Sequence, residues 1–195
     1  MYPHERALPQ HYIVGATWLL LGLVVGLHFP DVDLRLQGLI PSRVLLHRSI
    51  LTHGLIASVM LFWLIRSRRD AVPAHRLFVV GVSLAVAVHL CFDFFPRGWS
   101  GFALIHIPIY GRTTALFSQS WLILSIILCL YVAFLLVRNI IELALSIGHL
   151  LISLTVSAVK NKHPTTHLAV MLLALAVIVT VLMAHRVRKV AARRA

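Results

Sequence analysis

The sequence predicts an all-α, polytopic membrane protein, a helical bundle of about five or six transmembrane spans. Of its 195 residues, 59% are hydrophobic and only 12% are charged, and its mean hydropathy is +0.90. Charged residues make up about 25% of a typical soluble domain, so this chain has too few polar residues to cover a soluble protein of its size. Residues 1–195 are therefore expected to form a single integral membrane domain.

Apolar runs account for the predicted spans, since about 20 apolar residues cross a hydrocarbon core. Pro30 is expected to end the first run, and Pro73 marks a boundary in the loop before the third. The fifth run contains Glu142, which we expect to pair with Arg138 four residues earlier. It either crosses the membrane or lies at the interface beside the fourth run. The runs cover residues 12–29, 49–65, 77–95, 119–137, 140–159 and 167–184.

The basic residues indicate the orientation of the chain. Lys and Arg number 18 against six Asp and Glu, and the formal net charge is +12. They lie mainly in short loops between apolar runs, a distribution typical of topology signals and of contact with anionic head groups, not of nucleic-acid binding. With the N-terminus inside, eleven Lys or Arg fall on the cytoplasmic side and seven on the other. Both termini are therefore expected in the cytoplasm.

Polar residues gather in three short strings at the ends of the first three runs. The strings read His28-Phe-Pro-Asp31-Val-Asp33, His47-Arg-Ser-Ile-Leu-Thr-His53 and His89-Leu-Cys-Phe-Asp93. Carboxylates at the edge of the lipid are costly, so each needs a partner or a purpose. Because the spans alternate in direction, all three strings are expected at one membrane face, the periplasmic one in this orientation. The residues that meet there are Asp31, Asp33, His47, His53, His89 and Asp93.

Mixed carboxylate and imidazole side chains are the ligands of a metal site, and we take all six as candidate ligands. His89 and Asp93 are four apart on a helix, so both project from one face and can hold one ion. Zinc suits such a set, with manganese or magnesium as alternatives, singly or as a pair. A metal ion there would lower the pKa of a bound water and so supply a hydroxide nucleophile.

Other roles follow from the same strings. Asp33 and His53 are candidate catalytic residues, because one carboxylate or histidine of the set can act as general base in place of binding the ion. Arg48 is the candidate for stabilising developing negative charge. Ser49 is predicted to cap the second helix, with His47 folding back toward His53.

Each residue also has a structural interpretation. In this interpretation Asp33 pairs with Arg35, or Asp31 with Arg43, as a surface ion pair that contributes little to stability. His89 with Asp93 is then a structural hydrogen bond. Single membrane-edge histidines are expected to be interfacial or packing residues, namely His28, His106, His149 and His167. The gathering of six residues at one face favours the metal site over these interpretations.

The segment over residues 97–112 is too apolar for a free loop and is expected at the interface or beside the site. Its Arg97 and Arg112 are expected either to contact a phosphate or to anchor the chain to head groups.

The three strings, in this order, resemble those of the membrane-bound metal-dependent hydrolase family, which includes a LexA-regulated bacterial inner-membrane protein. The resemblance covers residues 11–112 and rests on Pro30-Asp31-Val-Asp33, on His47-Arg48 with Thr52-His53, and on His89 to Asp93 followed by Pro96 and Gly98. It implies a hydrolase distantly similar to zinc-dependent phospholipase C enzymes. The chain departs from the family at Gly54, where a serine commonly follows the second histidine.

The function expected from these observations is metal-dependent hydrolysis of an ester or phosphoester, in a phospholipid or lipid-phosphate substrate, at the periplasmic face of a bacterial inner membrane. The metal site is built from residues 28–112, and residues 119–184 add further membrane helices. Two alternatives belong to other classes. A metal or proton transporter would need ionisable groups near the bilayer midplane, which the fourth and sixth runs lack. A non-catalytic membrane protein would use the polar cluster only to fix helix packing.

Overall fold

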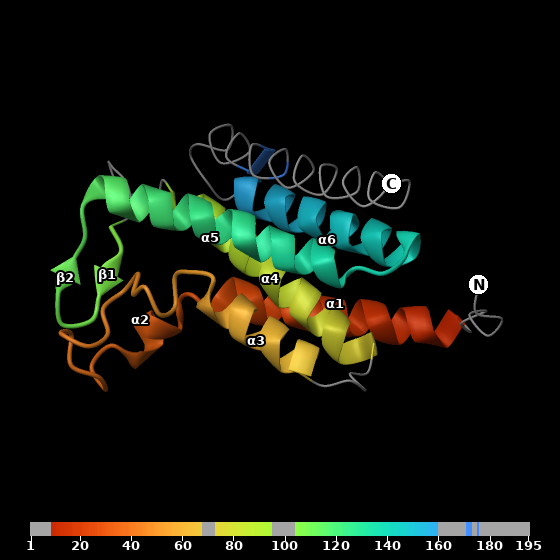
Figure 1. Cartoon of the computed structure of the whole chain (residues 1–195), viewed down its shortest axis with the longest axis horizontal. Helices are drawn as coiled ribbons and strands as arrows, with labels where there is room; N and C mark the ends of the chain where they lie inside the picture. Colours follow the sequence, from red (N-terminus) through yellow and green to blue (C-terminus); the bar gives the residue numbers. More distant parts are fainter. Residues whose placement is uncertain (1–8, 68–72, 95–103, 160–170, 173–174, 176–195) are drawn as a thin grey trace, which may run out of the picture.

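A computed structural model describes residues 9–67, 73–94, 104–159, 171–172 and 175 of the chain (Figure 1). Helices dominate this part, which confirms the all-α prediction, and two short strands pair antiparallel as a hairpin at one end. The elements are α1 (Pro9–His28), α2 (Val32–Leu36), α3 (Ile56–Ser67), α4 (Pro73–Asp93), β1 (His106–Ile107), β2 (Gly111–Arg112), α5 (Ala115–Leu136) and α6 (Ile140–Val159).

Three helices in the described residues are long and apolar enough to cross a membrane, so the fold is that of a membrane protein. They cover Ala74–Asp93, Ala115–Leu136 and Ile140–Val159. Residues 140–159 thus form one continuous helix despite Glu142. Ile13–His28 and Ile56–Arg66 are shorter apolar helices. The run predicted over residues 167–184 lies outside the described residues, apart from 171–172 and 175.

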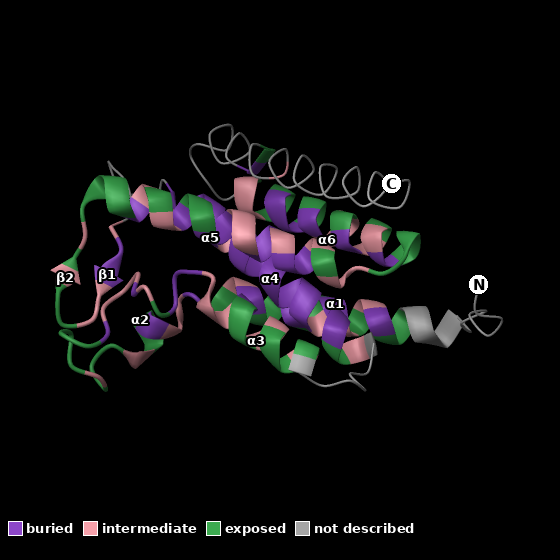
Figure 2. Ribbon diagram, in the orientation of Figure 1, coloured by how far each residue is buried: buried purple, intermediate pink, exposed green. Residues whose placement is uncertain are grey.

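α4 is the central helix of the bundle. It contacts α1, α3, α5 and α6, and every residue over 79–88 is buried (Figure 2). A helix that is apolar on all sides belongs inside such a bundle. The outer helices instead expose apolar side chains, for example Leu124 of α5 and Ile152 of α6. Those surfaces suit contact with lipid. The central position of α4 also fixes the place of the string from His89 to Asp93 in its last turns.

Glycines allow α1 and α4 to approach closely. A Cβ atom on Gly22 of α1 would lie 2.1 Å from the carbonyl oxygen of Phe78, and one on Gly81 of α4 would lie 2.1 Å from the carbonyl oxygen of Leu19. Small residues at such contacts are typical of membrane helices, where packing replaces the hydrophobic drive. The contact fixes how the final turns of α1 and α4 meet.

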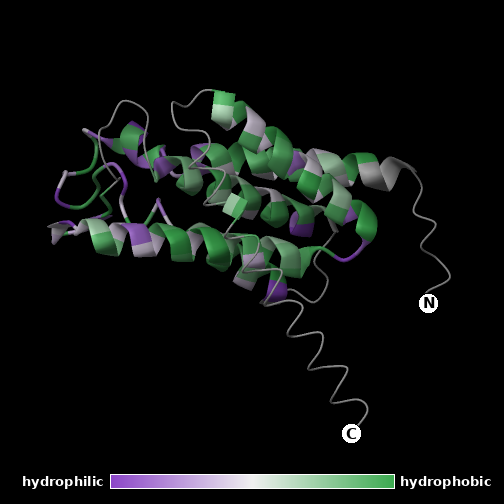
Figure 3. Ribbon diagram, turned by 90° about the horizontal axis from the view of Figure 1, so that it is seen from above, coloured by the Kyte–Doolittle hydropathy of each residue, from purple (hydrophilic) through white to green (hydrophobic). Residues whose placement is uncertain are grey.

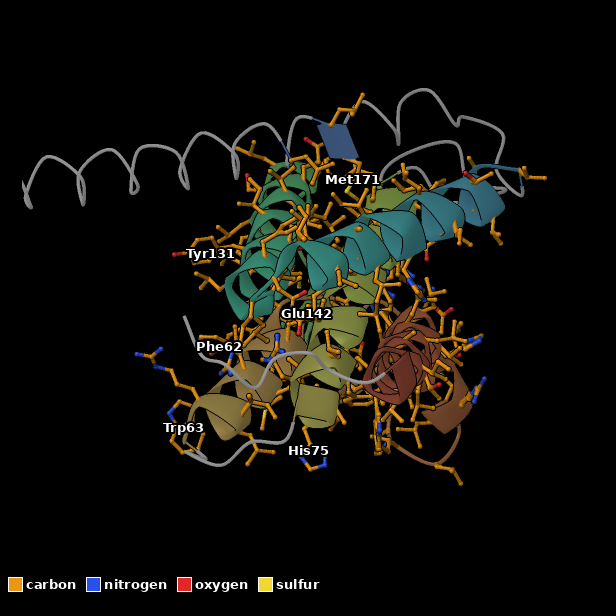
Figure 4. The ribbon with its side chains drawn as sticks, turned by 90° about the vertical axis from the view of Figure 1, so that its right-hand side faces the viewer. Phe62, Trp63, His75, Tyr131, Glu142 and Met171 are labelled. Atoms are coloured by element: carbon orange, nitrogen blue, oxygen red, sulfur yellow. The ribbon has the colours of Figure 1, made fainter. Side chains whose placement is uncertain are left out.

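A buried ion pair joins α4 to α6 at the end away from the hairpin. Arg76 donates to both carboxylate oxygens of Glu142 and to the carbonyl of Leu136, and Glu142 points from α6 toward α4 (Figure 4). The predicted ion pair of Glu142 with Arg138 is therefore wrong. The side chain of Arg138 is exposed and forms no ion pair with Glu142 in the described residues. Its backbone N–H donates to the carboxylate at 2.8 Å, and its charge acts on the carboxylate as a secondary influence. A buried carboxylate requires a buried cation, which Arg76 supplies.

The second predicted helix begins later than expected. It covers Ile56–Ser67 in place of residues 49–65, and turns occupy residues 49–55. Ser49 is not a helix cap: its backbone N–H donates to the Asp33 carboxylate at 3.2 Å, and its hydroxyl accepts from the N–H of Leu51. Side-chain hydrogen bonds of this kind compete with helix formation, so the chain turns here.

We predict that Gly22→Ala lowers the stability of the protein, because the added methyl group meets backbone atoms of α4 that cannot rotate away. Overpacking of this kind costs about 1–3 kcal/mol. Thermal unfolding of the detergent-solubilised protein measures the effect. Gly148→Ala in α6 is the matched control, since a Cβ there has nothing within 4 Å. Equal melting temperatures for the two variants would contradict the close contact.

Candidate metal centre

The three polar strings meet at one end of the bundle, beside the β1–β2 hairpin, where hydrophilic residues interrupt the apolar helices (Figure 3). All six predicted ligands lie here. Arg48, the remaining residue proposed for the site, lies in the loop between His47 and His53. The six ligands come from the start of α2 (Asp31 and Asp33), the segment between α2 and α3 (His47 and His53) and the last turns of α4 (His89 and Asp93).

Asp33 is fully buried and fastens the loop to α2. Its carboxylate accepts hydrogen bonds from the Thr52 hydroxyl at 2.7 Å, from the Ser49 N–H at 3.2 Å and from His47 Nδ1 at 3.1 Å. Burial alone would raise the pKa of Asp33, but these bonds and His53 hold the pKa well below its usual range. Asp33 is therefore ionised and bonded within the protein, not paired on the surface with Arg35.

His53 lies fully buried between two carboxylates. Its Nδ1 is 3.3 Å from Asp33 Oδ2 and 3.1 Å from the Thr52 hydroxyl, and its Nε2 is 3.1 Å from Asp93 Oδ2. Burial alone would lower the pKa of His53, but its contacts with Asp33 and Asp93 raise the pKa to about 9. The site thus favours positive charge at this position at neutral pH.

The backbone of His53 is held from the opposite side by α5. The indole Nε1 of Trp121 donates to the His53 carbonyl at 2.9 Å. A Cβ atom on Gly54 would lie 2.8 Å from the Trp121 ring. The indole therefore occupies the space that a serine side chain would need, which gives a physical reason for glycine at this position. Trp121 therefore packs against the site.

His89 is oriented by the end of α1. Its Nδ1 is 2.9 Å from the carbonyl of Leu27, and because a carbonyl only accepts, Nδ1 holds the hydrogen. The other nitrogen, Nε2, lies 3.4 Å from Asp93 Oδ2 and 3.7 Å from Asp31 Oδ1. A metal-binding histidine commonly donates its second ring N–H to a backbone carbonyl in this way.

Ring nitrogens and carboxylate oxygens face one another at the centre of the site. His53 Nε2 and Asp93 Oδ2 are both buried, lie 3.1 Å from each other and form no further hydrogen bond within the part of the chain described. Tetrahedral zinc with bonds of about 2.0–2.1 Å would separate its ligand atoms by about 3.3 Å. Here His53 Nε2 lies 3.1 Å from Asp93 Oδ2. His89 Nε2 lies 3.4 Å from the same oxygen and 3.7 Å from Asp31 Oδ1. The donor set therefore fits a small cation.

Two overlapping groups of side chains could hold an ion. Asp31, His53 and His89 form one, and Asp33, His47 and His53 form the other, with the ligand atoms of each group within 4.8 Å of one another. His53 belongs to both. Because its Nδ1 faces Asp33 and its Nε2 faces Asp93, one ring can bond to Asp33 and still offer a free nitrogen on the other side.

Arg48 lies in a strained turn packed against β1. Its φ is +64°, a left-handed conformation uncommon outside glycine. Its carbonyl accepts from the N–H of His106, and the N–H of Ile50 donates to the carbonyl of His106, each at 2.8 Å. The predicted segment beside the site is thus the hairpin from residue 104 onward, while residues 97–103 lie outside the described part.

Two residues near the centre were given no role at the site from the sequence. Thr52 joins Asp33 to His53 through its hydroxyl, and the sequence indicated it only through its place in the family string with His53. His106 was expected to be interfacial or a packing residue, and the packing alternative fits its burial, since only 3% of it is exposed. Its burial follows from the bridge between Ser49 and His106, a contact that no local pattern indicates.

Comparison with known proteins does not identify a relative. No protein-family model, no curated protein and no solved structure matches this chain. The function is therefore inferred from the residues and geometry of the site.

We expect the thermal stability of protein treated with EDTA to fall as the pH rises from about 6.5 to about 9, the ordinary and folded-state pKa values of His53. A raised folded-state pKa stabilises the fold below the ordinary value, and this stabilisation is lost as the imidazolium deprotonates. Melting temperatures across this range measure the effect. The exposed His28 supplies the control, since His28→Gln should leave the slope unchanged. Stability that is level or rising with pH would contradict the charge assigned to His53.

Proposed function

We propose that this chain is a membrane-bound metal-dependent hydrolase that cleaves an ester or phosphoester bond in a lipid-like substrate. The observation that carries the proposal is the convergence of the Nε2 atoms of His53 and His89 on one oxygen of Asp93. Each ring uses its other nitrogen on a protein acceptor, which leaves these two nitrogens available to a cation. The resemblance of the three strings to the membrane-bound metal-dependent hydrolase family supports the same activity.

In this proposal His53, His89 and Asp93 would hold the ion, and Asp31 is the more exposed carboxylate beside them. A bound zinc, manganese or magnesium ion supplies Lewis acidity and lowers the pKa of a water molecule. The side chain of Asp31 is 42% exposed, against 15% for Asp93. Asp31 therefore meets an entering substrate first and is the candidate fourth ligand or general base.

Asp33 and His47 support the ligands in this proposal. Asp33 is fully buried and bonded to Thr52, so it orients His53 and does not touch the substrate. Its charge makes His53 a stronger ligand, as carboxylates behind metal-binding histidines do. Asp33, proposed from the sequence as a catalytic residue, is thus a positioning residue.

The site lies at the ends of the helices, which favours reaction at a membrane face over transport, because transport sites lie near the midplane. Beside it, Ile109 and Tyr110 of the hairpin are 83% and 88% exposed and form an apolar tip suited to lipid. We further propose five or six spans in a bacterial inner membrane, with both termini cytoplasmic and the site periplasmic, as the distribution of Lys and Arg favours.

Metal content is the first test. We expect wild-type protein, purified without chelator, to contain about one equivalent of a divalent metal, and His53→Ala and Asp93→Ala to lose most of it. Each change removes a ligand whose atoms lie within 3.4 Å of another ligand atom. Elemental analysis measures the content, and the exposed His28→Ala is the matched control. Full occupancy in both site variants would refute the ligand assignment.

Hydrolysis is the second test. We expect wild-type protein in mixed micelles to release product from at least one member of a panel of phospholipids, lipid phosphates and carboxylic esters. Asp93→Ala should lower the rate by about 100-fold or more, since loss of a metal ligand removes the Lewis acid. EDTA should have the same effect, and zinc should restore it in wild type only. A metal-loaded protein that cleaves no member of the panel would contradict the hydrolase proposal.

A further inference from the structure

Two side chains beside the metal centre, the half-buried Arg48 and the buried His106, each have a buried nitrogen that lacks a hydrogen-bond partner in the described residues. These atoms are Nε of Arg48 and Nδ1 of His106. The N–H at Arg48 Nε can only donate, so it requires an acceptor. A buried donor without a partner costs folding free energy, and a ligand that supplies the acceptor removes that cost.

Backbone hydrogen bonds join His106 to Arg48 and to the loop that carries the candidate metal ligands. The N–H of His106 donates to the carbonyl of Arg48 at 2.8 Å. Ser49, the next residue, forms a bridge with His106 and donates its own N–H to Asp33. Both side chains therefore extend from hydrogen-bonded backbone positions, and Arg48 directly follows the candidate ligand His47.

The backbone at Arg48 is strained, which points to a role for its side chain. A φ of +64° suits glycine or asparagine much better than arginine. Residues in such conformations cluster at functional sites, where several surrounding contacts hold the backbone in place despite the strain. Here the hydrogen bond from His106 and the bond between Ser49 and Asp33 supply those contacts.

The charges around this position favour an anion. Arg35, Arg43 and Arg112 are exposed at the same end of the bundle, and Arg112 lies opposite His106 across the hairpin. The guanidinium group has planar, divergent N–H donors that match the oxygens of a phosphate better than a lysine does.

We infer that Arg48 and His106 form a subsite that binds the phosphate group of the substrate next to the metal centre. The inference rests on the proposed function and narrows its substrate to phosphate esters. Arg48 donates to the phosphate oxygens through its guanidinium, and His106 donates or accepts through Nδ1 according to the protonation of the phosphate. The phosphate is carried either by a lipid or by a soluble molecule, since the same donors recognise both.

Phosphate binding tests the inference without reference to turnover. The probes are inorganic phosphate, titrated into detergent-solubilised protein, and phosphatidic acid in nanodiscs. We expect Arg48→Gln and His106→Phe each to weaken binding by about tenfold or more, as loss of a charge-assisted hydrogen bond does. Arg48→Lys should recover part of the affinity. Arg35→Gln, which removes an exposed charge from the same end, is the matched control. Size-exclusion profiles and metal content show whether each variant is folded.

Each result has a distinct meaning. Binding of phosphatidic acid alone, lost in both variants, supports the subsite and places its phosphate on a lipid, while binding of inorganic phosphate as well supports it for soluble groups too. Wild-type affinity in both Arg48→Gln and His106→Phe overturns the subsite, as does a metal-loaded wild type that binds neither probe. Metal-free wild type that binds phosphate through Arg48 supports the subsite and instead contradicts the proposed hydrolase.

Discussion

The buried carboxylate of Asp33 determines the geometry of the whole site. A carboxylate in apolar surroundings is costly unless its oxygens are fully bonded. Asp33 meets this demand with the Thr52 hydroxyl, the Ser49 N–H and the His47 ring. The loop must therefore turn over residues 49–55 to reach it, which delays the start of α3 and aims His53 at the end of α4. One short helix, α2, thus organises ligands that belong to other segments.

Much of the fold follows from apolar runs, and the meeting of the three strings follows from the alternation of spans. Contacts between distant residues were beyond sequence reasoning. The prediction of Ser49 as a helix cap was wrong because capping preference depends on local sequence, whereas the distant carboxylate of Asp33 accepts the hydrogen bond from the Ser49 N–H. Arg138 was chosen for Glu142 because it is near in sequence, whereas burial selects Arg76. His106 was left as either interfacial or packing because a lone histidine in an apolar segment is ambiguous until the hairpin buries it.

The site gains precision from the rigid position of α4. At one end Arg76 ties this helix to α6, and along its length glycines bring its backbone against α1. His89 and Asp93 lie in its last turns, more than ten residues and therefore about 20 Å beyond Arg76. Ligands on well-packed helices keep their geometry better than ligands on loops. The loop residues His47 and His53 lack that support, and the bonds to Asp33 provide it instead.

In the proposed function, a divalent cation would balance the charges of this site at a single point. A proton on His53 neutralises part of the charge of Asp33 and Asp93, but Nε2 of His89 still presents a lone pair to two carboxylates. A second proton there would place two imidazolium rings 5.6 Å apart, a repulsion that the carboxylates of Asp93 and Asp31 offset. In the proposed function, one doubly charged ion would instead be shared by both rings and both carboxylates. Sharing of one ion by all four groups supports the proposed metal centre over a polar cluster that serves only helix packing.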